Sequence, residues 1–99
     1  MALLSVIIPI KDEQDNILAL HERIVSALQP YCANSNGSGV HEFEVVYVDD
    51  GSIDKSPVIL SELARSDDRA KVVILKRNYG QTPALQAGID YVLLSYTFQ

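Results

Sequence analysis

The chain has 99 residues, a formal net charge of −5 and 47% hydrophobic residues. This length allows one small domain, and the acidic balance argues against a general nucleic-acid binder, which would carry a basic face. A single cysteine, Cys32, excludes an internal disulfide and is typical of a reducing compartment. The apolar run at residues 3–8 is too short for a signal or membrane segment and lacks a basic flank. We therefore expect a cytoplasmic protein.

The first predicted elements are a buried strand and an amphipathic helix. Residues 3–10 are almost all apolar, as in a strand buried on both faces, and Pro9 should end it because proline cannot donate to a central ladder. Asp12 or Asp15 can cap the following helix, and Pro30 should stop it. The apolar residues at helical spacing in this segment are Ile17, Leu20, Ile24 and Leu28.

Two more strand–helix pairs follow along the chain. A strand is predicted at about residues 43–48, and Asp54 is placed to cap a helix that ends at residues 66–68. A third strand is predicted at residues 72–75, and Thr82–Pro83 is typical of an N-cap followed by proline at the first helical position. The inward-facing residues expected in the second helix are Ile59, Leu60, Leu63 and Ala64. Those expected on one side of the third helix are Leu85, Ile89, Val92 and Leu93.

The element order is therefore β-α-β-α-β-α. Because such crossovers are right-handed, this order predicts an α/β fold with a parallel three-stranded sheet and helices packed on it. The polar stretch at residues 30–42 indicates a surface loop within one domain.

An acidic stretch ends the second predicted strand. The apolar run Val45–Val48 stops at Asp49 and Asp50, which Gly51 and Ser52 follow. Ligands bind at the carboxyl edge of open α/β sheets, and paired carboxylates suit hydrogen-bond donors such as base N–H groups, ribose hydroxyls or the water shell of a metal. The alternative is a simple turn with a helix cap, because Asp, Gly and Ser are common in turns.

All three strand-to-helix loops should meet at this edge. The first and third loops bring Lys11, Lys76 and Arg77 beside the acidic loop. Acids facing a base or ribose, with cations facing the pyrophosphate, would suit a nucleotide diphosphate. Each cation taken alone is better explained as a solvated surface charge, and it is the convergence of the three loops that favours a ligand site.

Three segments carry a resemblance to a known family. Residues 5–13, 48–54 and 77–88 resemble the nucleotide-binding half of a family 2 glycosyltransferase with the GT-A fold, of the dolichyl-phosphate mannose synthase or polyprenyl-phosphate glycosyltransferase type. The resemblance implies a three-layer, Rossmann-like unit with sheet order 3-2-1. It makes residues 1–99 a partial nucleotide-sugar-binding domain, in which residues 91–99 form a tail without the family pattern.

The resemblance also implies a nucleotide-sugar site. By this comparison, Pro9 and Glu13 contact the nucleoside, Val48 packs on the base, and Asp50 accepts a base N–H group. The full set of implied site residues is Pro9, Lys11, Glu13, Val48, Asp49, Asp50 and Arg77.

The remaining positions have less direct roles in the resemblance. Lys11 stands where the family motif usually has an aromatic residue, and Asp49 orients the loop. Arg77 lies in a loop beside the sugar diphosphate. A purely structural alternative for the third helix is that small residues let it pack closely on the sheet; these are Ala84, Ala87 and Gly88.

The chain departs from the family after the third helix. The complete family enzyme is expected to use Mg or Mn bound by a DxD motif, but residues 90–99 carry no such motif, no acceptor site and no catalytic base. We therefore expect this chain alone to be inactive, because a leaving diphosphate would lack charge stabilisation. The implied substrates of the complete enzyme are a UDP- or GDP-linked sugar and a lipid phosphate at the cytoplasmic face of a membrane.

Two further expectations concern assembly and function. In the family, a fourth strand covers the first, so residues 3–10 should form an open, apolar edge through which the chain self-associates. The alternative to an enzyme fragment is a non-catalytic nucleotide-binding or interaction remnant. A phosphoacceptor domain using Asp49 or Asp50 would not fit the pattern after Gly80.

Overall fold

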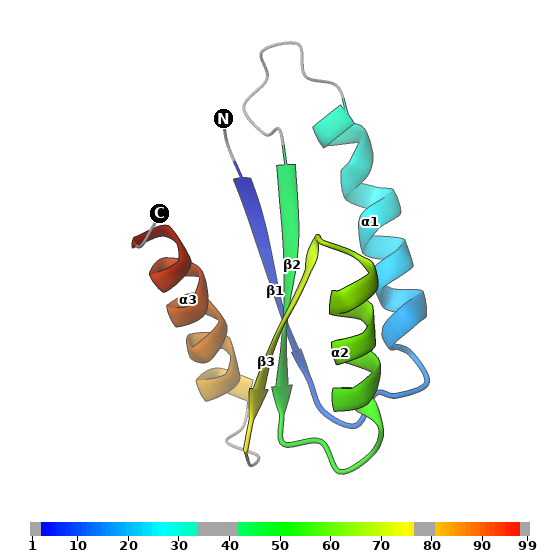
Figure 1. Cartoon of the computed structure of the whole chain (residues 1–99), viewed down its shortest axis with the longest axis vertical. Helices are drawn as coiled ribbons and strands as arrows, with labels where there is room; N and C mark the ends of the chain where they lie inside the picture. The colour runs from blue at the N-terminus through cyan, green and yellow to red at the C-terminus, as the bar shows by residue number, and fades with distance from the viewer. Residues whose placement is uncertain (1–2, 34–41, 77–80, 98–99) are drawn as a thin grey trace.

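The computed structural model describes residues 3–33, 42–76 and 81–97. Strands and helices alternate along this part of the chain (Figure 1). The strands are β1 (Leu3–Ile10), β2 (Glu42–Asp50) and β3 (Ala70–Leu75), and the helices are α1 (Ile17–Ala33), α2 (Ser56–Ser66) and α3 (Gln81–Thr97). All strand pairs are parallel and the sheet order is β1-β2-β3, which confirms the predicted α/β class and the predicted order.

The central strand β2 sets the positions of its neighbours. Its pairing with β1 runs from Leu3↔Glu42 to Ile10↔Asp49, and its pairing with β3 runs from Val45↔Ala70 to Asp50↔Leu75. Because the strands are parallel, their carboxyl ends lie at one edge of the sheet. The helices start from that same edge.

Side chains of β2 pack alternately into two apolar layers, one on each face of the sheet, because successive side chains of a strand point to opposite faces. One layer lies between the sheet and the pair α1 and α2; its buried members are Ile10, Ile17, Phe43, Val45, Tyr47, Leu60, Leu63 and Ala70. The other lies under α3, where Val46 and Val48 are fully buried. Figure 1 shows α3 separated from α1 and α2 by the strands, so the molecule has the predicted three layers.

The face that α3 turns to the sheet differs from the predicted one. Leu85 and Ile89 are 37% and 42% exposed, whereas Ala87, Tyr91 and Val92 pack on the β2 layer. A Cβ atom on Gly88 would lie 3.1 Å from Cγ2 of Val48 and closer still to Cγ2 of Ile7. The helix therefore uses its small residues to approach the sheet, as the structural alternative for this helix proposed, and Leu85 and Ile89 do not share the contact that Val92 makes with the sheet.

Three predicted boundaries at prolines are also wrong. β1 continues through Pro9 to Ile10, which an edge strand tolerates because it pairs on one side only. α1 runs past Pro30 to Ala33, because the proline removes one helical hydrogen bond close to the helix end, where only three helical residues follow it. α3 begins at Gln81, so Thr82–Pro83 lies inside the first turn, where main-chain N–H groups have no helical partner to lose.

A polar network crosses the layer between α1, α2 and the sheet and includes Tyr47, two residues before Asp49 on β2. His21 is 5% exposed; its Nδ1 lies 2.7 Å from the hydroxyl of Tyr47 and its Nε2 lies 2.8 Å from Oδ2 of Asp67. Arg69 donates Nε–H and Nη2–H to the same carboxylate at 3.0 and 3.2 Å. These hydrogen bonds from Arg69, with that from His21, hold the pKa of Asp67 well below its usual range, while burial raises the pKa of Tyr47.

Replacing Gly88 with alanine should destabilise the fold by about 1–3 kcal/mol, because the added methyl group overpacks the α3–sheet contact. Helix propensity alone would favour alanine by about 1 kcal/mol, so the sign of the change is diagnostic. Urea unfolding of the two proteins measures it. A variant more stable than the parent would show that α3 does not approach the sheet this closely.

Acid should weaken the fold through Asp67. Its pKa is lower in the folded chain than in the unfolded one, so its contribution is complete above about pH 4 and is lost as the pH falls below that value. Asp67→Asn should cost about 1–3 kcal/mol at pH 7 and flatten the acid limb of stability against pH. Urea unfolding from pH 7 to pH 2.5 tests this, with the exposed neighbour variant Asp68→Asn as control. An acid limb that is equally steep in Asp67→Asn would contradict the assignment.

Candidate functional site

The two acids predicted to bind ligand are the last residues of β2. Asp49 and Asp50 are 1% and 5% exposed and pair in register with Ile10 of β1 and Leu75 of β3. The central position of β2 accounts for this burial, since a neighbouring strand flanks each side. The carboxylates are therefore held on regular secondary structure at the carboxyl edge, and they belong to β2 itself.

Asp49 has one satisfied and one unsatisfied oxygen. Its Oδ2 accepts the N–H of Ser52 at 3.2 Å. Its Oδ1 is buried without a hydrogen-bond partner, and within residues 3–33, 42–76 and 81–97 no other buried side-chain nitrogen or oxygen lacks one. Buried acceptors are nearly always hydrogen-bonded in native proteins, so this oxygen can accept a donor from a bound molecule.

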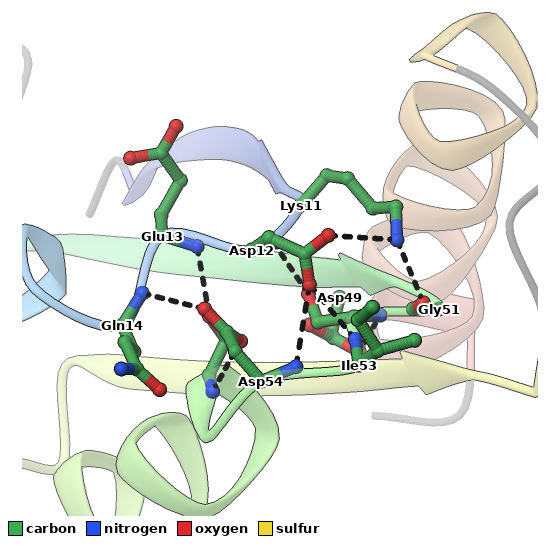
Figure 2. A network of polar contacts seen from close by, with 10 residues as sticks. Lys11, Asp12, Glu13, Gln14, Asp49, Gly51, Ile53 and Asp54 are labelled. Carbon is green, nitrogen blue, oxygen red and sulfur yellow. Dashed lines mark hydrogen bonds and ion pairs between the residues drawn. The ribbon is translucent and has the colours of Figure 1, made fainter.

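Two loops from distant parts of the chain are joined beside these acids, and we call this set of bonds the loop clamp (residues 11–14 with 51–56; Figure 2). Asp12 is central to it: its Oδ1 accepts the N–H groups of Ile53 and Asp54 at 2.8 and 3.3 Å. The N–H of Asp12 donates to Oγ of Ser52 at 2.9 Å. Lys11 Nζ donates to the carbonyl oxygen of Gly51 at 3.1 Å and pairs with Oδ2 of Asp12 at 3.0 Å.

The second half of the clamp ties the first loop to the start of α2. The N–H of Glu13 donates to Oγ of Ser56 at 2.9 Å, and the N–H of Gln14 donates to Oδ2 of Asp54 at 3.1 Å. Gln14 Oε1 in turn accepts the N–H of Lys55 at 2.9 Å. Since each loop supplies both donors and acceptors, neither can move without breaking bonds to the other.

Hydrogen bonds within the clamp lower the pKa values of two of its carboxylates, Asp12 and Asp54. The hydrogen bond from Lys11, together with the N–H of Ile53, lowers the pKa of Asp12 below its ordinary value. Burial alone would raise the pKa of Asp54, but hydrogen bonds from Ser56 and the N–H of Gln14 outweigh it and lower that pKa. Both carboxylates therefore stay ionised at neutral pH.

The predicted helix caps differ from the observed ones. Neither Asp12 nor Asp15 caps α1; Asn16 precedes the helix, and its carbonyl oxygen accepts the N–H of Leu20 at 2.9 Å. Asp12 is turned away because the second loop binds its carboxylate. Asp54 does accept the N–H of Ser56, the first residue of α2, at 2.8 Å, but from one position before the N-cap residue Lys55.

The predicted site residues are distributed as follows. Pro9 and Val48 are paired in register, one residue before the acids. The ammonium group of Lys11 lies in the clamp, whereas the exposed side chain of Glu13 points away from it in Figure 2 and accepts from Asn16 at 2.9 Å. Arg77 lies outside the described residues. The structure thus joins two of the three predicted loops at one edge.

Sequence reasoning missed the polar residues that build the clamp. The sequence offers Asp12 only as one of two candidate helix caps, with Asp15, and it indicates no role for Gln14, Ser52 or Ser56. Their partners lie about 40 residues away, for example 41 between Asp12 and Ile53, so local patterns carry no signal for them. The one available hint was the density of Asp, Gln and Ser in both loops at the same predicted edge.

Neither a metal-ligand set nor a membrane-spanning helix is found among the described residues. Among them, no group of three or more His, Cys, Asp or Glu side chains is arranged to hold a metal ion, so the metal expected for the family finds no ligand set there. No helix in this part of the chain combines the length and apolarity needed to cross a bilayer.

Comparison with known proteins identifies the family. The model of glycosyl transferase family 2 matches residues 5–96. The chain is 42% identical over 89 residues to undecaprenyl-phosphate 4-deoxy-4-formamido-L-arabinose transferase of Edwardsiella ictaluri, an alignment that covers 89% of this chain and 25% of the relative. It is 38% identical over 88 residues to dodecaprenyl-phosphate galacturonate synthase of Rhizobium johnstonii, covering 88% and 24%. It is also 38% identical over 88 residues to an uncharacterized glycosyltransferase of Synechocystis, covering 89% and 25%.

The chain spans about a quarter of the length of these curated relatives. Two of the three carry polyprenyl-phosphate names, which agrees with the type predicted from the motifs. With the parallel α/β order observed and a family match over nearly its whole length, the chain belongs to glycosyl transferase family 2.

Proposed function

We propose that this chain is the nucleotide-sugar-binding portion of an inverting glycosyltransferase that transfers a sugar from a nucleotide diphosphate to a polyprenyl phosphate or similar acceptor. Family membership and the names of the relatives support the reaction class and the lipid-phosphate acceptor. The observation that carries the binding role is the pair of buried carboxylates at the end of β2, one of which has an unpartnered oxygen.

In this proposal, the acids face the nucleoside. Carboxylate oxygens accept from base N–H and ribose O–H groups, and Asp49 and Asp50 end the central strand where such a ligand would lie. Pro9 and Val48, which pair in register one residue before the acids, are assigned to the base by the family resemblance. Glu13 is assigned to the nucleoside by the family resemblance.

The cations face the diphosphate. Lys11 uses two of its three donors within the clamp, which leaves the third for a phosphate oxygen. Arg77 is assigned to the same end of the ligand by the family resemblance. We assign no catalytic residue within this chain and no step to a metal, although Mg or Mn is expected for the family. The donor nucleotide is UDP or GDP, and calorimetry distinguishes the two.

Nucleotide binding is testable by titration calorimetry of the chain with UDP and with GDP, with and without manganese. We expect binding of one of them, and a loss of about ten- to hundredfold in affinity in Asp50→Asn, because a charged hydrogen bond to the ligand is weakened. Asp68→Asn, an exposed carboxylate at the turn before β3, is the matched control and should bind as the parent does.

Absence of heat with both nucleotides would contradict the proposal and favour the alternative of a non-catalytic interaction remnant. Equal affinity in Asp50→Asn and the parent would place any binding elsewhere on the chain.

We also propose that the chain self-associates through β1. Within the described residues β1 pairs with β2 only, which leaves one row of its N–H and C=O groups without a strand partner, and Leu4 is 39% exposed there. Sedimentation should show a concentration-dependent dimer or larger species. Leu4→Lys should shift it toward monomer, because a charge on an edge strand opposes edge-to-edge pairing.

The control for this experiment is Leu18→Lys, which changes an apolar residue that is 60% exposed on α1. A monomer at every concentration, or an equal shift with Leu18→Lys, would contradict association through β1.

A further inference from the structure

The geometry points to Asp12 as a positioning residue that holds the acidic end of β2 in its ligand-binding orientation. This inference rests on the proposed nucleotide site and adds a residue that does not itself contact ligand. Two hydrogen bonds of Ser52 link Asp12 to Asp49.

The backbone conformation of Asp12 turns this residue toward the second loop. Its φ is 53°, a left-handed conformation that is uncommon outside glycine and is enriched in Asp and Asn. This backbone turn directs the N–H toward Oγ of Ser52 and the carboxylate toward the N–H groups of Ile53 and Asp54. One residue therefore fixes three consecutive residues of the turn that follows the acids.

Ser52 connects this turn to Asp49. Its Oγ accepts from Asp12, and its own N–H donates to Oδ2 of Asp49. With Oδ2 held in this way, rotation of the Asp49 carboxylate is restricted. The unpartnered Oδ1 keeps one direction, as a ligand acceptor requires.

Lys11 holds the first residue of the same turn. Gly51, at a φ of 70°, follows Asp50 directly, and its carbonyl oxygen accepts from Nζ of Lys11. The Lys11 ammonium also pairs with Oδ2 of Asp12, so three protein donors already occupy that carboxylate. Asp12 is thus engaged with the protein, and its effect on a ligand would pass through residues 51–54 to the acids.

The test uses Asp12→Gly, which removes the carboxylate but keeps the left-handed backbone accessible, and Asp12→Asn, which keeps an acceptor oxygen and tolerates that backbone. Asp15→Ala is the matched control, because it removes an exposed carboxylate from the same loop. Nuclear magnetic resonance of each chain reports the hydrogen exchange of the Ser52 N–H and the carboxyl carbon shift of Asp49, neither of which contacts the Asp12 carboxylate.

We expect Asp12→Gly to speed hydrogen exchange at the Ser52 N–H by about tenfold or more and to move the carboxyl carbon shift of Asp49. Asp12→Asn should stay close to the parent in both.

In calorimetry with the nucleotide that the parent binds, Asp12→Gly should lose about tenfold in affinity, Asp12→Asn should recover most of it, and Asp15→Ala should match the parent. If Asp12→Gly does not fold, Ser52→Ala, which breaks the same chain of bonds one step later, takes its place.

Unchanged Ser52 exchange and Asp49 shift in Asp12→Gly would overturn the inference, whether or not nucleotide binds. Parent-like affinity in Asp12→Gly would also overturn it and would leave the proposed function standing. If the parent binds neither UDP nor GDP, the proposed function fails, and the resonance measurements alone decide whether Asp12 orients Asp49.

Discussion

The candidate site depends on hydrogen bonds between two loops that lie about 40 residues apart in the chain, the loop after β1 and the turn after β2. Each loop supplies side-chain acceptors to the main-chain N–H groups of the other, and the carboxylate of Asp12 alone accepts two of them. Because main-chain donors need partners, this exchange keeps both loops folded against the acidic end of β2. Without it, the two buried acids would end a strand beside unconstrained loops.

The packing beneath the acids complements this clamp. Val48, directly before Asp49, is fully buried under α3, and Gly88 lets that helix approach closely enough to cover it. On the opposite face, Tyr47 is anchored through His21 to Asp67. The end of β2 is therefore fixed from both faces of the sheet, so the position of the carboxylates follows from the core as well as from the loops.

The sequence predicted what depends on local apolar patterns. The three apolar runs indicated the strands and the edge at which Asp49 and Asp50 would lie, and the family resemblance implied the order of the strands in the sheet. It misjudged Pro9 and Pro30, because the tolerance for a proline depends on strand position and on distance from the helix end. The apolar spacing of α3 did not show which residues meet the sheet, because contact there depends on the close approach that Gly88 allows, and Leu85 and Ile89 stay partly exposed. The role of Asp12 could not be predicted, since its partners are distant in the chain.

The central claim is that the carboxyl edge of the sheet, around the end of β2, binds a nucleotide diphosphate. Mapping amide shifts of the nitrogen-15-labelled chain during addition of UDP or GDP tests it most directly. The account predicts that the perturbed amides gather at residues 10–13 and 48–54, with the outer face of α1 unaffected. Perturbation that spreads over the outer face of α1 or along β1, with residues 48–54 unchanged at saturation, would contradict it.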